Sequence, residues 1–437
     1  MAKAAQRTDY VRSETDLFSE PGYDISLLSS CRTEHHPHSS ITETGPIEFI
    51  VQGNDTQYVD LSKTRLKLTC KVVNEDGSDI AAAPVSPGDY KYAPVNNLIG
   101  SAFERVTVHL NGTEVTPKAS LYPYQAYLET LLSYGSDYKK GQAEAAGYYR
   151  VEDETSDSDK GLEARQAVCL KSKQFEISGR PHGELFGQTR FLMPGIDIQI
   201  RFDRSTNAFC MVNGGTIKKK VKLSIISAKL YMQKISLLPS IHMAHLKMWK
   251  TQPCVYPGKR VEMKSYSLPI GTFQHTNENL LNGLIPDRLI IGLVATTNVQ
   301  GSHATNPFNF ASHGLEQIII TCNTETPTQH IINVDEDENR YVDGFISLFD
   351  AMGISNCDNG LDLKLKEYIK GKTLYGFDLR NLSDGFAIPR HGNSSIYLKF
   401  KTQLAASLTV IVYPEYPSVM YISGDKQVYF KDYAREY

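Results

Sequence analysis

Apolar and polar side chains alternate with a period of two residues along much of this chain. Residues 61–72 show the pattern most clearly, with Leu66 and Leu68 on one face and Arg65 and Lys67 on the other. Because successive side chains of a strand point to opposite faces, this segment is predicted to be a half-buried strand. Comparable runs predict further strands at 47–51, 106–110, 174–177, 196–202, 221–232, 288–291, 396–400 and 408–412.

Two parts of the chain repeat the same order of predicted elements. Residues 103–110 and 315–322 both read as strands that end in an Asn turn. Each is followed, after a turn-rich stretch, by one amphipathic helix, predicted at 124–135 and at 340–353. A unit that recurs after about 212–218 residues indicates two tandem copies of one domain. A duplicated β-rich domain is more typical of an assembly protein than of an enzyme.

The length of the chain, 437 residues, allows two domains of about 200 residues each. Short strands bounded by turn signals favour a sandwich or barrel, and about eight strands per copy fit a Greek-key jelly roll. The predicted fold is all-β: two tandem eight-stranded jelly-roll domains, each with a short helix, plus extended N- and C-terminal arms. The predicted boundaries are an N-terminal arm at 1–44, jelly roll 1 at 45–235, a linker at 236–246, jelly roll 2 at 247–413 and a C-terminal tail at 414–437.

Four segments are predicted to lie outside the sandwiches. The arm 1–44 is polar with little periodicity, so we expect it to be ordered only where it lies on a neighbour. Residues 74–96 and 135–173 are predicted loops, and the second is long enough to carry contacts. The tail 414–437 is rich in Tyr. It either anchors another molecule through these aromatic rings or packs on its own domain.

Composition excludes several classes of protein. A net charge of −3 gives no basic field for nucleic acid, so we expect no sequence-specific nucleic-acid binding. No apolar run approaches the roughly 20 residues that span a bilayer, and residues 1–20 show no signal-peptide pattern. The seven cysteines include no C-x-x-C pair, which favours a reducing compartment.

One short motif resembles a metal site. His36, His38 and Glu43 match part of the cupin pattern, and cupins are also jelly rolls. Metal ligands need rigid strands, whereas these residues lie in a Ser- and Pro-rich arm. Neither a nucleophile elbow, a P-loop nor an H-E-x-x-H motif occurs. We therefore assign no catalytic, cofactor-binding or metal-ligating residue and no cofactor, and we expect no enzyme activity.

Two charged runs have a structural and a functional interpretation. Lys218–Lys220 could touch phosphate or act as a weak nuclear signal, but such a run before a strand is more often a solvated strand entry. Asp335–Glu338 could bind Ca²⁺, but it lacks the spacing of an EF-hand loop. Because it precedes the second predicted helix, stabilising that helix N-terminus is a sufficient role.

Four segments carry a more specific resemblance: 95–104, 106–112, 122–132 and 375–379. Together they resemble the major capsid (hexon-like) protein of Maverick/Polinton elements and adintoviruses, over roughly residues 45–415. The resemblance implies a double jelly-roll capsid protein that forms trimers with a pseudo-sixfold outline. Such trimers tile an icosahedral shell with separate penton proteins at its vertices. These motifs are structural, so the resemblance implies no active site.

The resemblance also implies partners and a location. The chain would form a homotrimer, contact neighbouring capsomers, and meet penton and minor capsid proteins in the virion, after synthesis in the cytoplasm or nucleus of the host. We expect removal of 1–44 to leave trimers but to impair shell formation. Two alternatives remain open, namely a β-sandwich module that binds glycans or proteins and a cupin-like metalloenzyme.

Overall fold

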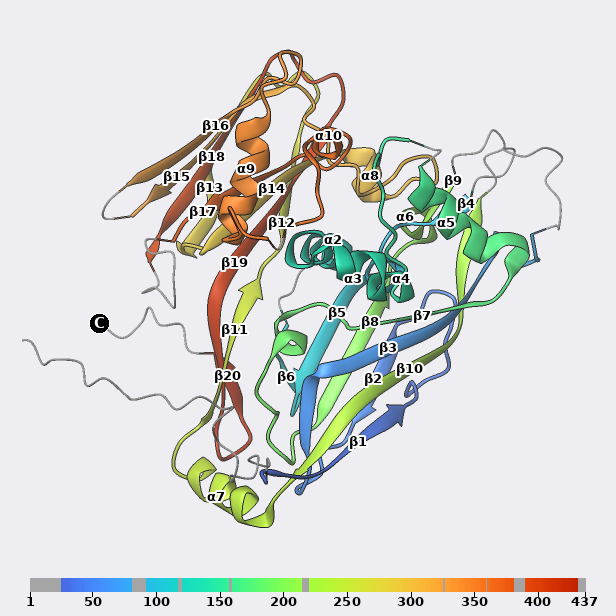
Figure 1. Ribbon diagram of the computed structural model, residues 1–437, viewed down its shortest axis with the longest axis vertical. Helices are drawn as coiled ribbons and strands as arrows, with labels where there is room; N and C mark the ends of the chain where they lie inside the picture. Colours follow the sequence, from blue (N-terminus) through green and yellow to red (C-terminus); the bar gives the residue numbers. More distant parts are fainter. Residues whose placement is uncertain are drawn as a thin grey trace, which may run out of the picture.

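The computed structural model describes residues 25–80, 92–116, 120–156, 159–213, 220–324, 327–358, 360–380 and 390–430. Figure 1 shows two β-sandwiches, one blue to green and one yellow to red, with short helices between them. All pairs of neighbouring strands within these sheets run antiparallel.

The first sandwich is built from the N-terminal half of the chain. Its strands are β1 (Leu27–His35), β2 (Ile47–Val51), β3 (Tyr58–Asn74), β4 (Tyr92–Pro94), β5 (Phe103–Leu110), β6 (Thr113–Glu114), β7 (Phe175–Gly179), β8 (Ile198–Arg204), β9 (Met211–Asn213) and β10 (Val221–Leu237). Its helices are α1 (Leu98–Ser101), α2 (Tyr122–Ser133), α3 (Ser136–Lys140), α4 (Gln142–Ala145), α5 (Lys160–Cys169) and α6 (Asn207–Cys210), with short 3-10 turns at Leu170–Ser172 and Glu184–Gly187.

The helix α7 (Pro239–Trp249) leads into the second sandwich. The strands that follow are β11 (Cys254–Val261), β12 (Lys264–Leu268), β13 (Gln274–Leu284), β14 (Arg288–Ala295), β15 (Leu315–Asn323), β16 (Thr328–Asn333), β17 (Leu374–Asp378), β18 (His391–Phe400), β19 (Leu408–Ile422) and β20 (Val428–Phe430). Its helices are α8 (Thr296–Gln300), α9 (Val342–Met352) and α10 (Leu365–Tyr368).

Strand order confirms the predicted duplication. The first sandwich has sheets ordered β1-β10-β3-β7 and β2-β8-β5-β6, and the second has β11-β19-β14-β17 and β13-β18-β15-β16. Each strand of the first sandwich has a counterpart at the same position in a sheet of the second, for example β10 and β19 at the second position. This strand order is that of a jelly roll. Even an irregularity repeats, because the register shifts between Phe103 and Arg105 in one copy and between Leu315 and Gln317 in the other. A bulge kept at matching positions is a feature of the fold rather than a defect.

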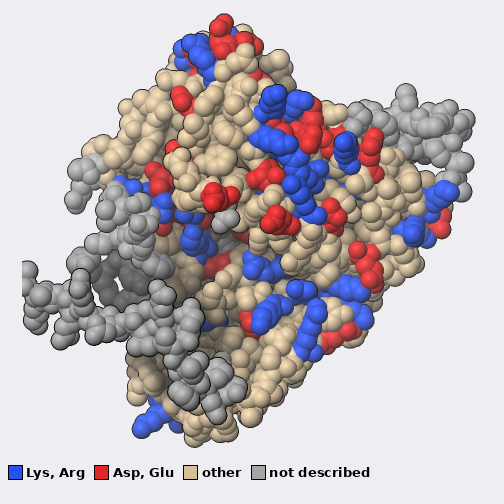
Figure 2. Space-filling model, in the orientation of Figure 1, with Lys and Arg blue, Asp and Glu red and all other residues tan. Residues whose placement is uncertain are grey.

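The alternating pattern of β3 forms the core as predicted. Leu66, Leu68 and Cys70 are buried between the two sheets of the first jelly roll. On the outer face, Lys67 pairs with Glu176 at 2.8 Å. On the face of the molecule that Figure 2 shows, Lys and Arg side chains lie among Asp and Glu side chains. This face is therefore mixed in charge rather than uniformly basic.

Both predicted helices of the repeat are present, with shifted ends. The predictions 124–135 and 340–353 correspond to α2 and α9. α9 ends where Gly353 adopts φ 68°, a left-handed conformation that favours glycine. No helix within the described ranges is long and apolar enough to cross a membrane.

The N-terminal arm predicted at 1–44 differs from the structure over its second half. Residues 27–35 form β1, which pairs with β10 of the same chain. The hydrogen-bonding edge of β10 explains the difference, because it supplies a partner that the polar sequence of the arm does not reveal. Residues 1–24 lie outside the described residues.

The predicted linker and tail also contain regular structure. Residues 236–246 hold the end of β10 and most of α7. The tail predicted from 414 begins inside β19, which continues to Ile422 and turns back as β20. Its tyrosines include Tyr416, which is buried, and Tyr421, whose ring stacks on Tyr429 at 5.5 Å. Within the part described, the tail therefore packs on its own chain.

The prediction of a loop at 135–173 is wrong. It contains α3, α4 and α5, and it buries Lys139, Tyr148 and Arg165. Its many polar residues suggested a solvated excursion, but several of them, such as Lys139 and Arg150, have partners on the second jelly roll. In the other predicted loop, 74–96, the described end contains β4, and 81–91 lies outside the described residues.

Candidate functional site

Outside the sandwich cores, the two jelly rolls contact each other through a buried apolar cluster and a set of ion pairs and hydrogen bonds. We call this contact the joint. α2 of the first jelly roll lies at its centre (Figure 1). The Tyr127 ring stacks on Phe308 with centroids 4.2 Å apart, and Tyr124 meets the same ring edge-on at 5.6 Å. The Tyr124 hydroxyl donates to the Pro307 carbonyl at 3.1 Å. Packed aromatic pairs with a satisfied hydroxyl give a rigid contact.

Aliphatic side chains extend this contact across the outer face of a sheet. Leu128, Leu131 and Leu132 of α2 share one buried cluster with Ile290 of β14 and Ile411 of β19. β14 is therefore buried on both faces, one facing the joint and one facing the interior of its own sandwich. This double burial explains why β14 is a continuous apolar run rather than an alternating strand.

Gly292 allows the close approach in the middle of β14. A Cβ atom there would lie 2.5 Å from the Phe310 ring and 2.8 Å from Leu374. Any larger side chain would push the ring away from the strand. A glycine within this strand is thus a packing requirement of the joint.

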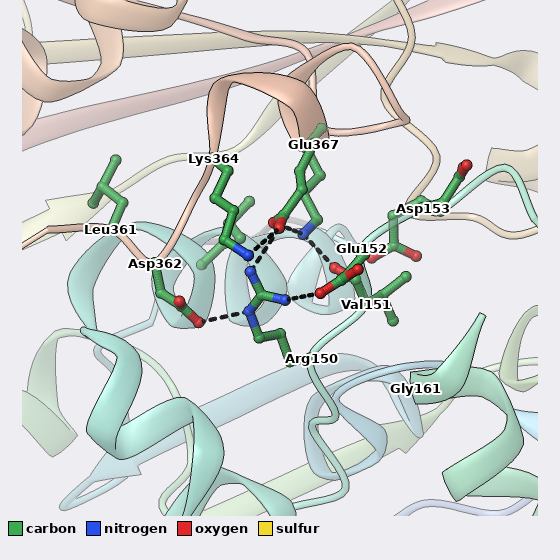
Figure 3. A network of polar contacts seen from close by, with 12 residues as sticks. Arg150, Val151, Glu152, Asp153, Gly161, Leu361, Asp362, Lys364 and Glu367 are labelled. Carbon is green, nitrogen blue, oxygen red and sulfur yellow. Dashed lines mark hydrogen bonds and ion pairs between the residues drawn. The ribbon is translucent and has the colours of Figure 1, made fainter.

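A charged network crosses the joint beside α10 (Figure 3). The guanidinium of Arg150 donates to Asp362 at 3.1 Å and to Glu367 at 2.6 Å, both from the second jelly roll. A third bond, of 2.9 Å, reaches Glu152. Asp362 and Glu367 are largely shielded from solvent. Removing one partner of such a pair leaves an uncompensated charge and costs about 3–5 kcal/mol.

Two buried lysines bind backbone carbonyls across the same boundary. Lys372 Nζ donates to the Val151 carbonyl at 2.5 Å. Lys139 Nζ donates to the Leu131 carbonyl at 2.7 Å and to the Leu361 carbonyl. Burial lowers the pKa of Lys139 to about 7, although nearby Asp362 favours its charged form.

Glu154 connects the aromatic and charged parts of the joint. Its carboxylate accepts from the Tyr127 hydroxyl at 2.9 Å and from the Asn306 amide at 2.6 Å. Burial raises the pKa of Glu154, and Arg165 and Lys372 oppose this shift. Burial also lowers the pKa of Arg165, whose Nε donates to the Pro94 carbonyl at 3.0 Å. Of these hydrogen bonds, the one from Asn306 crosses the joint and helps to fix the orientation of the two jelly rolls.

A second candidate surface lies at the α7 end of the molecule. An apolar groove of about 410 Å³ there is lined by residues that include Phe191, Trp249 and Tyr256. Met243 and Met248 of α7 are exposed. Exposed methionine beside an apolar groove is typical of an interaction surface.

The structure does not assemble the cupin-like motif of His36, His38 and Glu43. His36 lies 3.4 Å from the exposed carboxylate of Glu34, and Glu43 is ion-paired with Lys222 at 2.6 Å. Within the described ranges, no group of three or more His, Cys, Asp or Glu side chains is placed to hold a metal ion. All seven cysteines lie in described segments, and each is unpaired.

The two charged runs have local partners. Lys218 and Lys219 lie outside the described residues, and Lys220 is 3.8 Å from Glu75. In the acidic run, Asp335 accepts from Arg340 at 2.9 Å and from Lys401 at 3.3 Å. This run precedes α9, as predicted, and its ion pairs occupy two of the four carboxylate positions.

No model of a known protein family matches the chain. Among curated proteins, one from Caenorhabditis elegans that is described only as uncharacterised is 24% identical over 408 residues. The aligned region covers 91% of this chain and 96% of that protein.

Three solved structures have a similar fold. A chain from the cryo-EM structure of the Sputnik virophage has a TM-score of 0.66 at 10% identity, covering 99% of this chain and 94% of that one. The mavirus major capsid protein has a TM-score of 0.55 at 12% identity, with coverage of 99% and 95%. The Faustovirus major capsid protein has a TM-score of 0.55 at 8% identity, with coverage of 94% and 93%. The chain therefore has the double jelly-roll fold of viral major capsid proteins, which confirms the predicted fold class.

Proposed function

We propose that this chain is a major capsid protein whose trimers, pseudo-hexameric in outline, tile an icosahedral viral shell. The observation that carries the proposal is the joint, which fixes two jelly rolls of the same strand order at a defined angle. The likeness to the mavirus major capsid protein over 99% of the chain supports the same role. The function is assembly, and the proposal assigns no enzyme activity to the chain.

The geometry of a duplicated subunit suits this role. Three copies of a chain with two similar jelly rolls present six similar walls, and a closed rotational trimer can pack in a hexagonal array. Such packing requires that the two jelly rolls do not move relative to each other. The buried aromatic stack and the Arg150 network provide that rigidity.

We also propose the closer placement in Maverick/Polinton elements or adintoviruses. What supports this placement is the resemblance of segments 95–104, 106–112, 122–132 and 375–379 to that family. The chain would occupy the virion beside penton and minor capsid proteins after synthesis in the host cytoplasm or nucleus. The boundary between the two jelly rolls would lie at 236–246, as predicted. The first jelly roll would also include β1, and the second would also include β20 and the part of β19 beyond residue 413.

The direct test is size-exclusion chromatography with light scattering on the expressed chain, followed by negative-stain imaging of each peak. We expect a mass near three times 48.9 kDa and particles with a hexagonal outline or closed shells. A monomer at every concentration that binds a glycan or protein would overturn the proposal in favour of a β-sandwich binding module.

A further inference from the structure

The helix α9 is apolar on both of its long sides. Gly344, Leu348 and Ala351 are buried against the second jelly roll. On the other side, Val342 and Ile346 are 43% and 47% exposed, a large fraction for aliphatic side chains of a helix. A helix that is apolar all round is normally buried all round.

The outer side forms a continuous stripe. Val342, Phe345, Ile346 and Phe349 follow the spacing i, i+3, i+4, i+7, which places them along one face of the helix. Phe345 and Phe349 are partly buried, and their rings lie 5.0 Å apart. The charged residues of α9 are two aspartates, so little polarity interrupts the stripe. We call these four residues the α9 stripe.

The first jelly roll shows what normally covers such a helix. α2 follows the hairpin β5–β6, as α9 follows the hairpin β15–β16, and each precedes the last strand of the opposing sheet. α2 is also apolar on nearly every side, but nine of its residues are buried. Its outer side is covered by the second jelly roll, through the Phe308 ring and the Pro307 carbonyl.

We propose that the α9 stripe is covered by the first jelly roll of a second copy of this chain. The inference rests on the proposed trimer. It names the α9 stripe as the surface through which neighbouring copies in that trimer contact each other. Within one chain, the helix of jelly roll 1 docks on jelly roll 2. In a closed ring of alternating jelly rolls, the helix of jelly roll 2 must then dock on jelly roll 1 of the next copy. The internal joint is the template for the contact between copies.

The chemistry of the stripe fits this partner better than a ligand or a solvent-facing role. Two exposed aliphatic side chains flanked by two phenylalanines form the centre of a protein interface, where aromatic residues contribute most. The nearby hollow, of about 490 Å³, is lined mainly by polar and charged residues such as Glu316, Arg340 and Lys399. These groups would form the polar rim of the contact.

The test compares two lysine substitutions in the second jelly roll. Ile346→Lys places a charge in the stripe, whereas Ile270→Lys places one in an exposed turn where the side chain is 68% exposed. We expect Ile346→Lys to raise the concentration for half-maximal trimer formation by about 30-fold or more, as for a central interface residue. We expect Ile270→Lys to leave it unchanged. Light scattering reports the mass and circular dichroism the fold.

Thiol labelling tests the contact without a destabilising charge. In the isolated trimer, the thiol introduced by Ile346→Cys should react with iodoacetamide at least about tenfold more slowly than the one introduced by Ile270→Cys, because a covered side chain loses access to solvent. Equal labelling rates in the trimer, or wild-type trimer formation by Ile346→Lys, would overturn the α9 contact while leaving the trimer intact. A wild-type chain that stays monomeric would instead overturn the proposed function.

Discussion

At the scale of single residues, the joint combines apolar contacts with charged groups held by ion pairs or hydrogen bonds, such as Arg150, Lys139 and Glu154. Tyr127 is the clearest case, because its ring stacks on Phe308 while its hydroxyl donates to Glu154. A buried carboxylate without such partners would cost several kcal/mol. Each polar group in the joint thus limits the ways in which the two jelly rolls can pack.

Leu128 tests the apolar part of the joint. It is fully buried in the cluster that joins α2 to the second jelly roll. We expect Leu128→Asp to lower the free energy of unfolding by about 3–5 kcal/mol, because it buries a charge without a partner. The matched control is Leu170→Asp, at a site that is 43% exposed, with an expected change within about 0.5 kcal/mol. Urea denaturation measures both, and equal effects would contradict the assignment of α2 to the joint.

Lys139 makes the stability of the protein depend on pH. Its pKa is lowered to about 7 by burial, whereas an unfolded lysine titrates near about 10.4. Between pH 7 and 9 the unfolded chain therefore holds more protons at this site than the folded chain, so the free energy of unfolding rises with pH. Below about pH 7 the amine is charged in both states and the burial cost is fully present.

The Lys139→Met variant isolates this effect, since methionine fills a similar volume and does not titrate. From pH 7 to 9, the free energy of unfolding of the wild type should rise by roughly 2 kcal/mol more than that of the variant. Urea melts at both pH values give the difference. If the two proteins respond to pH in parallel, the lysine is charged in the folded state throughout this range.

The polar contacts of the joint could not be predicted from the sequence. Arg150, Glu154 and Lys139 lie in the segment predicted as a polar loop, and each has a partner on the second jelly roll more than 150 positions away. A single sequence gives no measure of such distant pairing. The helical apolar spacing of α2 was readable, because its side chains repeat on one face within one short segment.

At the scale of elements, hydrogen-bonding edges decide what the polar segments become. β1 is largely exposed and carries few apolar side chains, so its sequence resembles a disordered arm. It is nevertheless a strand, because β10 pairs with β3 along one edge and leaves its other edge for β1. Strands of the interior were predictable because burial imposes alternation, whereas an edge strand is held mainly by backbone bonds.

The position of β1 separates two N-terminal truncations. A chain that starts at Ile25 keeps β1 and should melt at the wild-type temperature. A chain that starts at Gly45 loses the strand, exposes the edge of β10, and should melt lower and aggregate, because an unpaired edge recruits other strands. Thermal melting and size-exclusion chromatography distinguish them. The effect on shell formation that was predicted for removal of 1–44 is therefore to be measured on the chain that starts at Ile25, which keeps β1. Equal melting temperatures of the two truncated chains would contradict the role of β1.

At the scale of the whole molecule, the chain connects its two halves at both ends of the joint. Besides the cluster around α2, the C-terminal strands return to the first jelly roll. Met420, Ile422 and Val428 belong to its core, and Trp249 donates to the Ile422 carbonyl at 3.0 Å. Figure 1 shows β19 and β20 running from the second sandwich alongside the first. The core of the second sandwich is built from its own half of the chain, whereas the core of the first includes these C-terminal residues.

Shared cores predict that the two jelly rolls unfold together. Calorimetry on the wild type should give one transition whose calorimetric and van't Hoff enthalpies agree. Ile320→Ala, deep in the second jelly roll, and Leu128→Asp, at the joint, should each move this single transition to lower temperature. Two resolved transitions, with Ile320→Ala moving one of them, would mean that the joint is weaker than its contacts indicate. A single transition would show that neither jelly roll unfolds without the other, as the buried contacts of the joint predict.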